Sequence, residues 1–227
     1  MIQQFKLSNI DATKPEIVIF DWDDTLIKSG NIYQILFEKV MRDLNSSDSV
    51  RAAREYYRHY SLNEAFPMIF GDDWKKARDL YYNHLSNVDL SNIEVMEHAE
   101  DVLKHMQSED LTMLIVSNKN GNVLRDEVKR IGWEKYFTGI VGASDAKRDK
   151  PWPDPAQLAL SAFSFSSPEK VWFVGDSIVD AKCAHSISAQ FVLFGDQNTQ
   201  KDVDNAMVPY LYVADHKELI LLHNMAK

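Results

Sequence analysis

The sequence predicts an α/β protein in which a mostly parallel sheet carries a small inserted helical domain. Short runs of β-branched and aromatic residues alternate with helical patterns along most of the chain, as is typical of βαβ units. The alternation is interrupted once, after the first strand, by a long stretch with helical patterns and no convincing strand. Of the 227 residues, 45% are hydrophobic and 26% are charged, so the chain has the composition of a globular protein with a proper core.

The elements of the sheet follow from the apolar runs and from the helical patterns between them. The expected strands are Glu16–Phe20, Leu111–Val116, Gly139–Val141, Val171–Val174, Phe191–Phe194 and Tyr210–Val213. The expected helices are Glu97–Gln107, Asn122–Ile131, Pro155–Phe163, Val179–Ile187 and His216–His223. Asp154 before Pro155 has the pattern of an N-cap with proline at the first helical position. Asp215 and Glu218 have the spacing of a capping box.

The interruption defines the expected domain organisation. Residues 27–93 would form a helical cap domain, and residues 1–26 and 94–227 the core domain. Helical patterns run over Ile32–Leu44, Val50–Tyr60 and Asp73–Leu85, and a looser segment of residues 61–72 joins the last two. Arg54, Arg58 and His59 could contact a substrate, although a solvated helix face is the simpler interpretation.

Charge and composition exclude several classes of function. The net charge of −9 argues against general binding to nucleic acid or anionic membranes, because both need basic surfaces. No apolar run approaches the ~18 residues of a membrane-spanning helix, and the N-terminal segment lacks the apolar region of a secretory signal. The single cysteine, Cys183, cannot form an internal disulfide. We therefore expect a cytoplasmic protein, and an anionic small substrate remains compatible with its charge.

The densest functional signal is the segment FDWDDTL at residues 20–26. An apolar strand runs directly into Asp21, Asp23 and Asp24. Ligands bind at the carboxyl ends of the strands in open parallel sheets, which is where these acids fall. Clustered carboxylates repel one another unless a cation neutralises them, so the segment suggests Mg²⁺ bound by oxygen ligands. Taken alone, it could also be a polar turn after a strand.

Three further strand ends carry polar residues of the same kind. Ser117 and Asn118 follow one strand, Lys150 precedes a proline-rich segment, and Asp176 follows another strand with Asp180 four residues later. Each has a plain structural alternative: a helix cap, a solvated lysine or a turn. Together, and in this order, they indicate one common site.

These four segments resemble the motifs of the haloacid dehalogenase-like (HAD) superfamily, over about residues 16–195. The segment from Asp21 to Thr25 is similar to the first motif, D-x-D-x-T, while Ser117 and Lys150 occupy the second and third motifs. GDSIVD at residues 175–180 is similar to the fourth motif. The resemblance implies a Rossmann-like fold and Mg²⁺-dependent phosphoryl transfer through an aspartyl-phosphate. The insertion after the first motif resembles the C1-type cap of phosphoglycolate-phosphatase-like and sugar-phosphate phosphatases.

The chain departs from the family pattern at two places. Asp24 stands where phosphatases of this type often have glycine. The fourth-motif helix ends in Ile187-Ser188, where many relatives have Ala-Gly. An extra acid at residue 24 could alter local charge, whereas the second departure concerns a turn and not the chemistry.

The resemblance and the chemistry of each side chain together assign the catalytic residues. Asp21 would attack phosphorus, and Asp23 would protonate the leaving oxygen and later deprotonate water. Ser117 would bind a phosphoryl oxygen, and Lys150 would pair with Asp21 and the phosphate.

Further residues would hold the metal and the substrate. The expected ligands of Mg²⁺ are Asp21, the backbone carbonyl of Asp23 and Asp176, with Asp180 nearby. Asn118 would assist Ser117 at the phosphate, and Thr25 would steady the loop or Asp23 beside the substrate.

These assignments predict a Mg²⁺-dependent phosphatase of a small phosphorylated metabolite, either phosphoglycolate-like or a sugar phosphate. Dehalogenation is rejected because dehalogenases lack the second acid, which is present here as Asp23. A phosphomutase or phosphonate hydrolase on the same core remains an alternative. A catalytically inactive binding protein is a third, but it would be expected to lose Asp21, Asp23, Lys150 or Asp176. The physiological substrate and the oligomeric state do not follow from the sequence.

Overall fold

The protein is built on one six-stranded parallel sheet, seen in a computed structural model that describes residues 12–29, 32–46, 60–87, 93–195, 197–205 and 210–227. The strand order is β5-β4-β1-β6-β7-β8, and every neighbouring pair is parallel. The strands are β1 (Ile17–Phe20), β4 (Thr112–Asn120), β5 (Gly139–Ala143), β6 (Val171–Gly175), β7 (Gln190–Phe194) and β8 (Leu211–Val213). All six predicted strands are present, which confirms the predicted α/β fold.

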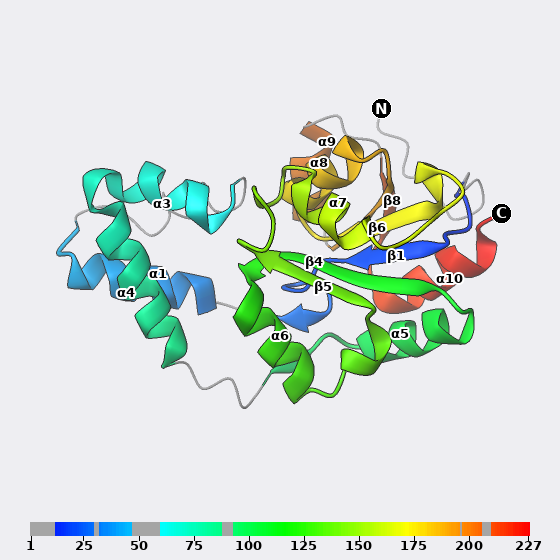
Figure 1. The fold of residues 1–227 in the computed structure, drawn as a ribbon, viewed down its shortest axis with the longest axis horizontal. Coiled ribbons are helices and arrows are strands. Elements are labelled where there is room, and N and C mark those ends of the chain that lie inside the picture. Colours follow the sequence, from blue (N-terminus) through cyan, green and yellow to red (C-terminus); the bar gives the residue numbers. More distant parts are fainter. Residues whose placement is uncertain (1–11, 30–31, 47–59, 88–92, 196, 206–209) are drawn as a thin grey trace.

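The strands are continuously apolar because helices cover both faces of the sheet. In β1, Val18 and Phe20 pack into one hydrophobic cluster, whereas Ile17 and Ile19 pack into the other. The helices that pack into the first cluster are α5 (Ala99–Ser108), α6 (Gly121–Arg130) and α10 (His216–Met225). Those on the opposite face are α7 (Asp154–Leu160), α8 (Ile178–Ser186) and α9 (Gln197–Asn205), and Figure 1 shows the two layers. Within the described residues, no helix is long and apolar enough to cross a membrane.

The inserted helices form a separate hydrophobic cluster beside the sheet (Figure 1). They are α1 (Ile32–Asp43), α3 (Leu62–Phe70) and α4 (Trp74–Ser86), with a 3₁₀ turn at Gly71–Asp73. Phe37 lies at the centre, with its ring 5.7 Å from that of Phe66 and 5.6 Å from that of Tyr81. The helix expected over Val50–Tyr60 lies outside the described residues except for Tyr60, as do Arg54, Arg58 and His59.

A short antiparallel ribbon that the sequence analysis did not predict connects the insertion to the sheet. It consists of β2 (Ile27–Lys28) and β3 (Glu94–Val95), with Ile27 opposite Val95. Lys28 and Glu94 form an ion pair across it. The division into a cap of residues 27–93 and a core of residues 1–26 and 94–227 stays a prediction.

Both departures from the family pattern fall where the backbone has a positive φ. Asp24 has φ 57° and Ser188 has φ 58°, the left-handed region that glycine adopts most easily. At the end of α8, the Ser188 N–H donates to the His185 carbonyl and the Ala189 N–H to the Ala184 carbonyl, which is a Schellman turn. Glycine would adopt either conformation easily, and this chain forms both turns without one.

His223 on α10 is expected to make folding sensitive to pH. The residue is completely buried, and its Nδ1 lies 3.0 Å from Nε2 of His105 on α5. Burial, followed by the charges of His105 and Lys14, lowers the pKa of His223 below its usual 6.5. The unfolded chain therefore binds the proton more readily. The contribution of neutral His223 to stability is present above pH 6.5 and is lost as pH falls toward the folded-state pKa.

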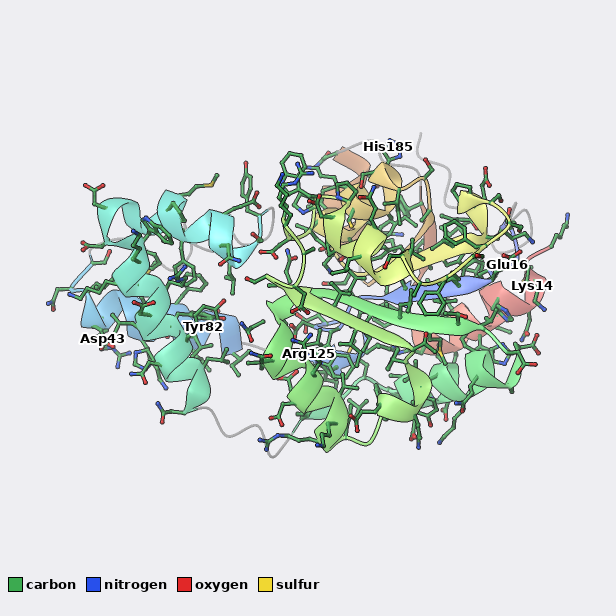
Figure 2. All side chains as sticks on the ribbon, in the orientation of Figure 1. Lys14, Glu16, Asp43, Tyr82, Arg125 and His185 are labelled. Atoms are coloured by element: carbon green, nitrogen blue, oxygen red, sulfur yellow. The ribbon has the colours of Figure 1, made fainter. Side chains whose placement is uncertain are left out.

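We expect the free energy of unfolding to fall between pH 7.5 and pH 5.5, and to fall less in His223→Gln. Urea unfolding of both proteins at the two pH values measures this. His185→Gln is the matched control because His185 is exposed on α8 (Figure 2), and it should retain the full pH dependence. An equal loss in His223→Gln and the wild type would contradict the prediction.

Candidate active site

The carboxyl ends of β1, β4 and β6 meet around the side chain of Lys150. The Lys150 ammonium donates to Oδ1 of Asp21 at 2.6 Å, to Oδ1 of Asp180 at 2.6 Å and to the Val116 carbonyl at 2.8 Å. Lys150 is 2% exposed and Asp21 7% exposed, so these contacts are shielded from water. Asp21 and Lys150 are more than a hundred positions apart in the chain, and the fold brings them into contact, as expected from the sequence.

Three carboxylates gather at this point against one ammonium. Oxygen atoms of Asp21, Asp176 and Asp180 all lie within 4.8 Å of one another. Burial raises the pKa of Asp21 to about 7. The charge of Lys150 only partly opposes this shift, and the negative charge of Asp180 adds to it. Burial and the charges of Asp180 and Asp21 likewise raise the pKa of Asp176 well above its usual range. A further cation beside the cluster would favour the ionised forms of Asp21 and Asp176, and this donor set is typical of a Mg²⁺ site.

Asp180 is more central than the sequence analysis expected. One carboxylate oxygen binds Lys150, and the other accepts from the backbone N–H of Ser177 at 3.1 Å and from its hydroxyl at 2.5 Å. This capping box starts α8. Gly175 makes room for it, because a Cβ atom there would lie 2.6 Å from Cβ of Asp180. The GD-S-x-x-D spacing therefore builds both the helix start and the carboxylate cluster.

The end of β4 is irregular where Ser117 and Asn118 lie, since the pairing with β5 shifts register between Val116 and Asn120. Such irregularities re-aim side chains and are common beside functional sites. Ser117 is buried, and its hydroxyl accepts from the N–H of Lys119 at 3.2 Å. The Asn118 side chain pairs with the backbone of Lys150: it donates to the carbonyl at 2.9 Å and accepts from the N–H at 2.9 Å. Asn118 thus holds the Lys150 segment, and its expected contact with a phosphate stays a prediction.

Thr25 lies in the loop that follows β1. It is completely buried, and within the described part of the chain its hydroxyl has no hydrogen-bond partner. The loop is closed instead by backbone hydrogen bonds, from the Leu26 N–H to the Trp22 carbonyl and from the Asp24 N–H to the Ile27 carbonyl. The structure gives Thr25 no bond to Asp23, and its role at the substrate stays a prediction.

Asp23 lies in a polar network that the sequence analysis missed. Its Oδ1 accepts from Lys119 Nζ at 2.7 Å and from the Ser29 hydroxyl. Lys119 also binds both carboxylate oxygens of Glu127 on α6. The Asp23 and Glu127 carboxylates outweigh the effect of burial and raise the pKa of Lys119. One signal was available, because Glu127 interrupts the apolar stripe of its helix next to Val128.

The cap touches the core beside Lys150. Asn63, at the start of α3, donates to Oδ2 of Asp149 at 2.8 Å. The next residue, Glu64, accepts from the indole N–H of Trp152 at 3.1 Å. Tyr82 on α4 lies on the side of the cap that faces the core (Figure 2), and burial together with the Asp149 charge raises its pKa. The cap therefore contacts residues that lie next to Lys150 in the sequence.

Comparison with known proteins agrees with this geometry. Residues 18–194 match the family described as haloacid dehalogenase-like hydrolase. The chain is 31% identical over 168 residues to the pyrophosphatase PpaX of Bacillus pumilus, covering 72% of this chain and 75% of that protein. It is 26% identical over 196 residues to a phosphoglycolate phosphatase of Cereibacter sphaeroides, covering 78% and 84%.

A solved structure extends the similarity over nearly the whole chain. The crystal structure of a HAD-superfamily hydrolase from Ehrlichia chaffeensis is 27% identical, with a TM-score of 0.62, and the match covers 93% of this chain and 97% of that chain. The resemblance drawn from the four sequence motifs is confirmed. This chain belongs to the haloacid dehalogenase-like hydrolases, as a C1-capped enzyme related to PpaX and phosphoglycolate phosphatase.

Proposed function

We propose that the protein hydrolyses a small phosphate ester or anhydride through a phosphorylated Asp21, with Mg²⁺ as cofactor. The observation that carries the proposal is the buried contact of Asp21 with Lys150 inside the carboxylate cluster. A buried acid that is hydrogen-bonded to a lysine can act as a nucleophile toward phosphorus, because the lysine neutralises charge on the phosphoryl oxygens.

The proposed reaction has two steps, transfer of the phosphoryl group to Asp21 and its hydrolysis by water. Asp21 forms a bond to phosphorus while the bond to the leaving oxygen breaks, and Asp23 gives that oxygen its proton. Water then attacks the phosphorus and gives a proton to Asp23, and the bond between phosphorus and Asp21 breaks, so that phosphate leaves and both carboxyl groups return to their starting states. Ser117 and Lys150 would hold the phosphoryl oxygens in both steps. Asp21, the Asp23 carbonyl and Asp176 would bind Mg²⁺, with Asp180 beside them, and the ion would supply further neutralisation of phosphate charge.

The cap supports a small substrate. It contacts the core through Asn63 and Asp149, next to the proposed phosphate site, so a bulky phosphoprotein would have to displace this contact. Named relatives act on pyrophosphate and phosphoglycolate, and sugar phosphates are the further candidates. Phosphomutase and phosphonate hydrolase activities are the alternatives that use the same core.

Assaying phosphate release tests the proposal. With 4-nitrophenyl phosphate we expect turnover that depends on Mg²⁺ and disappears in Asp21→Asn but persists in Asp126→Asn, whose carboxylate lies on the surface of α6. A panel of pyrophosphate, phosphoglycolate and sugar phosphates then identifies the preferred class. Isomerised sugar phosphate without phosphate release would favour a mutase. Complete inactivity with Mg²⁺ on every compound would overturn the proposal.

Asp176 provides a direct test of the metal site. Asp176→Ala removes a carboxylate from the cluster, so we expect Mg²⁺ affinity to fall by at least about 10-fold. Calorimetric titration of wild type, Asp176→Ala and the surface control Asp126→Ala measures the change. If Asp176→Ala binds Mg²⁺ as tightly as the control, Asp176 is only a turn residue.

A further inference from the structure

A chain of partly buried charges connects the proposed acid, Asp23, to helix α6. Lys119 Nζ lies 2.7 Å from Oδ1 of Asp23 and 3.0 and 2.7 Å from the two carboxylate oxygens of Glu127. The exposed fractions of the Lys119, Asp23 and Glu127 side chains are 9%, 13% and 3%. Glu127 Oε2 also accepts from the indole N–H of Trp22 at 2.7 Å. Since Trp22 stands between Asp21 and Asp23, the network is tied at both ends to the same catalytic loop.

We infer that Lys119, anchored by Glu127, is a positioning residue that orients the Asp23 carboxyl group for proton transfer. The inference rests on the proposed role of Asp23 as acid and base. Lys119 and the Ser29 hydroxyl both donate to the same oxygen of Asp23, and two donors on one oxygen restrict rotation of the carboxyl group. Proton transfer requires such restriction, because catalytic groups act efficiently only within about 0.5 Å of the productive geometry.

The placement of Lys119 favours this role over a purely structural ion pair. Buried ion pairs contribute little net stability compared with apolar residues of similar size, so stability alone gives little reason for three charges here. Lys119 also lies two residues after Ser117, on the irregular end of β4. The end of β4 would therefore bind the phosphate through Ser117 and hold Asp23, the acid that protonates the leaving oxygen, through Lys119.

The charge of Lys119 supports the same role. Negative charge develops on Asp23 as its proton moves to the leaving oxygen, and a fixed cation stabilises that state more than the starting one. Glu127 holds the ammonium in place and offsets part of its charge.

The test compares two substrates that differ in their need for a proton. Ethyl phosphate has an alkoxide leaving group that must be protonated, whereas 4-nitrophenyl phosphate releases a stable phenolate. We expect Lys119→Met to lower kcat about 100-fold with ethyl phosphate and less than about 5-fold with 4-nitrophenyl phosphate. Asp23→Asn should show the same selectivity with a larger loss. Adding Lys119→Met to Asp23→Asn should cause almost no further loss, because both changes remove one function.

The outcomes separate this inference from the proposed function. If Asp23→Asn loses activity equally with both substrates, the role of Asp23 is wrong and the inference fails with it. If Asp23→Asn is selective but Lys119→Met is not, or if the two losses add fully, only the inference is overturned. Lys129→Met, at the exposed end of α6, is the control and should match the wild type. Lys119→Met leaves the Glu127 charge without its cation and could fail to fold for that reason. In that case the double variant Lys119→Met, Glu127→Gln removes the charge, keeps an acceptor for Trp22 and carries the same expectations.

Discussion

Replacing Asp21 with asparagine is expected to lower kcat by about 10⁴-fold, which corresponds to about 5.4 kcal/mol of transition-state stabilisation. The amide cannot form the bond to phosphorus on which the proposed two-step reaction depends. The fold should survive, because the substitution removes a buried charge whose ionisation the surroundings already disfavour. The amide oxygen can still accept from Lys150 at the position of Oδ1.

Steady-state kinetics with 4-nitrophenyl phosphate, together with thermal melting, checks this expectation. Asp126→Asn provides the matched control, since it makes the same chemical change at an exposed carboxylate of α6. The phosphorylated aspartate should be detectable by mass spectrometry in the wild type during turnover and absent in Asp21→Asn. A variant that kept a tenth of the wild-type kcat would rule out Asp21 as the nucleophile.

Much of the fold could be predicted because its strands are buried on both faces. A run such as Ile17–Phe20 is apolar throughout, and only a strand between two helical layers explains so short a run. The ends were less certain: β4 continues to Asn120, beyond the predicted end at Val116. Helix α7 begins at Asp154 and not after it, so the predicted N-cap was wrong by one residue. The cap at Asp215 is confirmed, although Glu218 reaches the N–H of Ala214.

Elements without a long apolar pattern were missed or misjudged. Residues 61–72 were assigned only a looser helical pattern, and α3 forms there despite Pro67, starting from a capping box of Ser61 and Glu64. Helix α9 was not predicted, since it is strongly polar and Val203 is its one buried hydrophobic residue among those described. The two-residue strands β2 and β3 are too short for any periodicity to reveal.

The site likewise contains contacts that could be predicted from the sequence and contacts that could not. Asp21, Lys150 and Asp176 could be predicted together because parallel strands deliver their carboxyl ends to one edge of the sheet. For Thr25, the motif position does not tell which hydrogen bond the hydroxyl makes, and its role at the substrate stays a prediction. The bond between Lys119 and Asp23 and the contact between Asn63 and Asp149 join distant segments, so they emerge only from tertiary packing.

Lys150→Met is expected to separate metal binding from catalysis. The variant loses the ammonium that would neutralise the phosphate, so we expect kcat/KM to fall by about 10³-fold, or about 4 kcal/mol. Without Mg²⁺ it should also melt earlier, because breaking a buried ion pair typically costs about 3–5 kcal/mol. The affinity for Mg²⁺ should nevertheless rise, since three clustered carboxylates then attract the cation without an opposing positive charge.

Opposite changes in affinity and activity would show that Lys150 acts mainly through its charge. Calorimetric titration measures the affinity for Mg²⁺, thermal melting with and without Mg²⁺ measures stability, and phosphate release measures activity. Lys182→Met, at an exposed position of α8, is the matched control and should leave Mg²⁺ affinity, stability and activity unchanged. If Mg²⁺ affinity falls together with activity, the main task of Lys150 is to hold Asp21 and Asp180 in position through its two 2.6 Å contacts. Charge neutralisation would then fall chiefly to the metal ion.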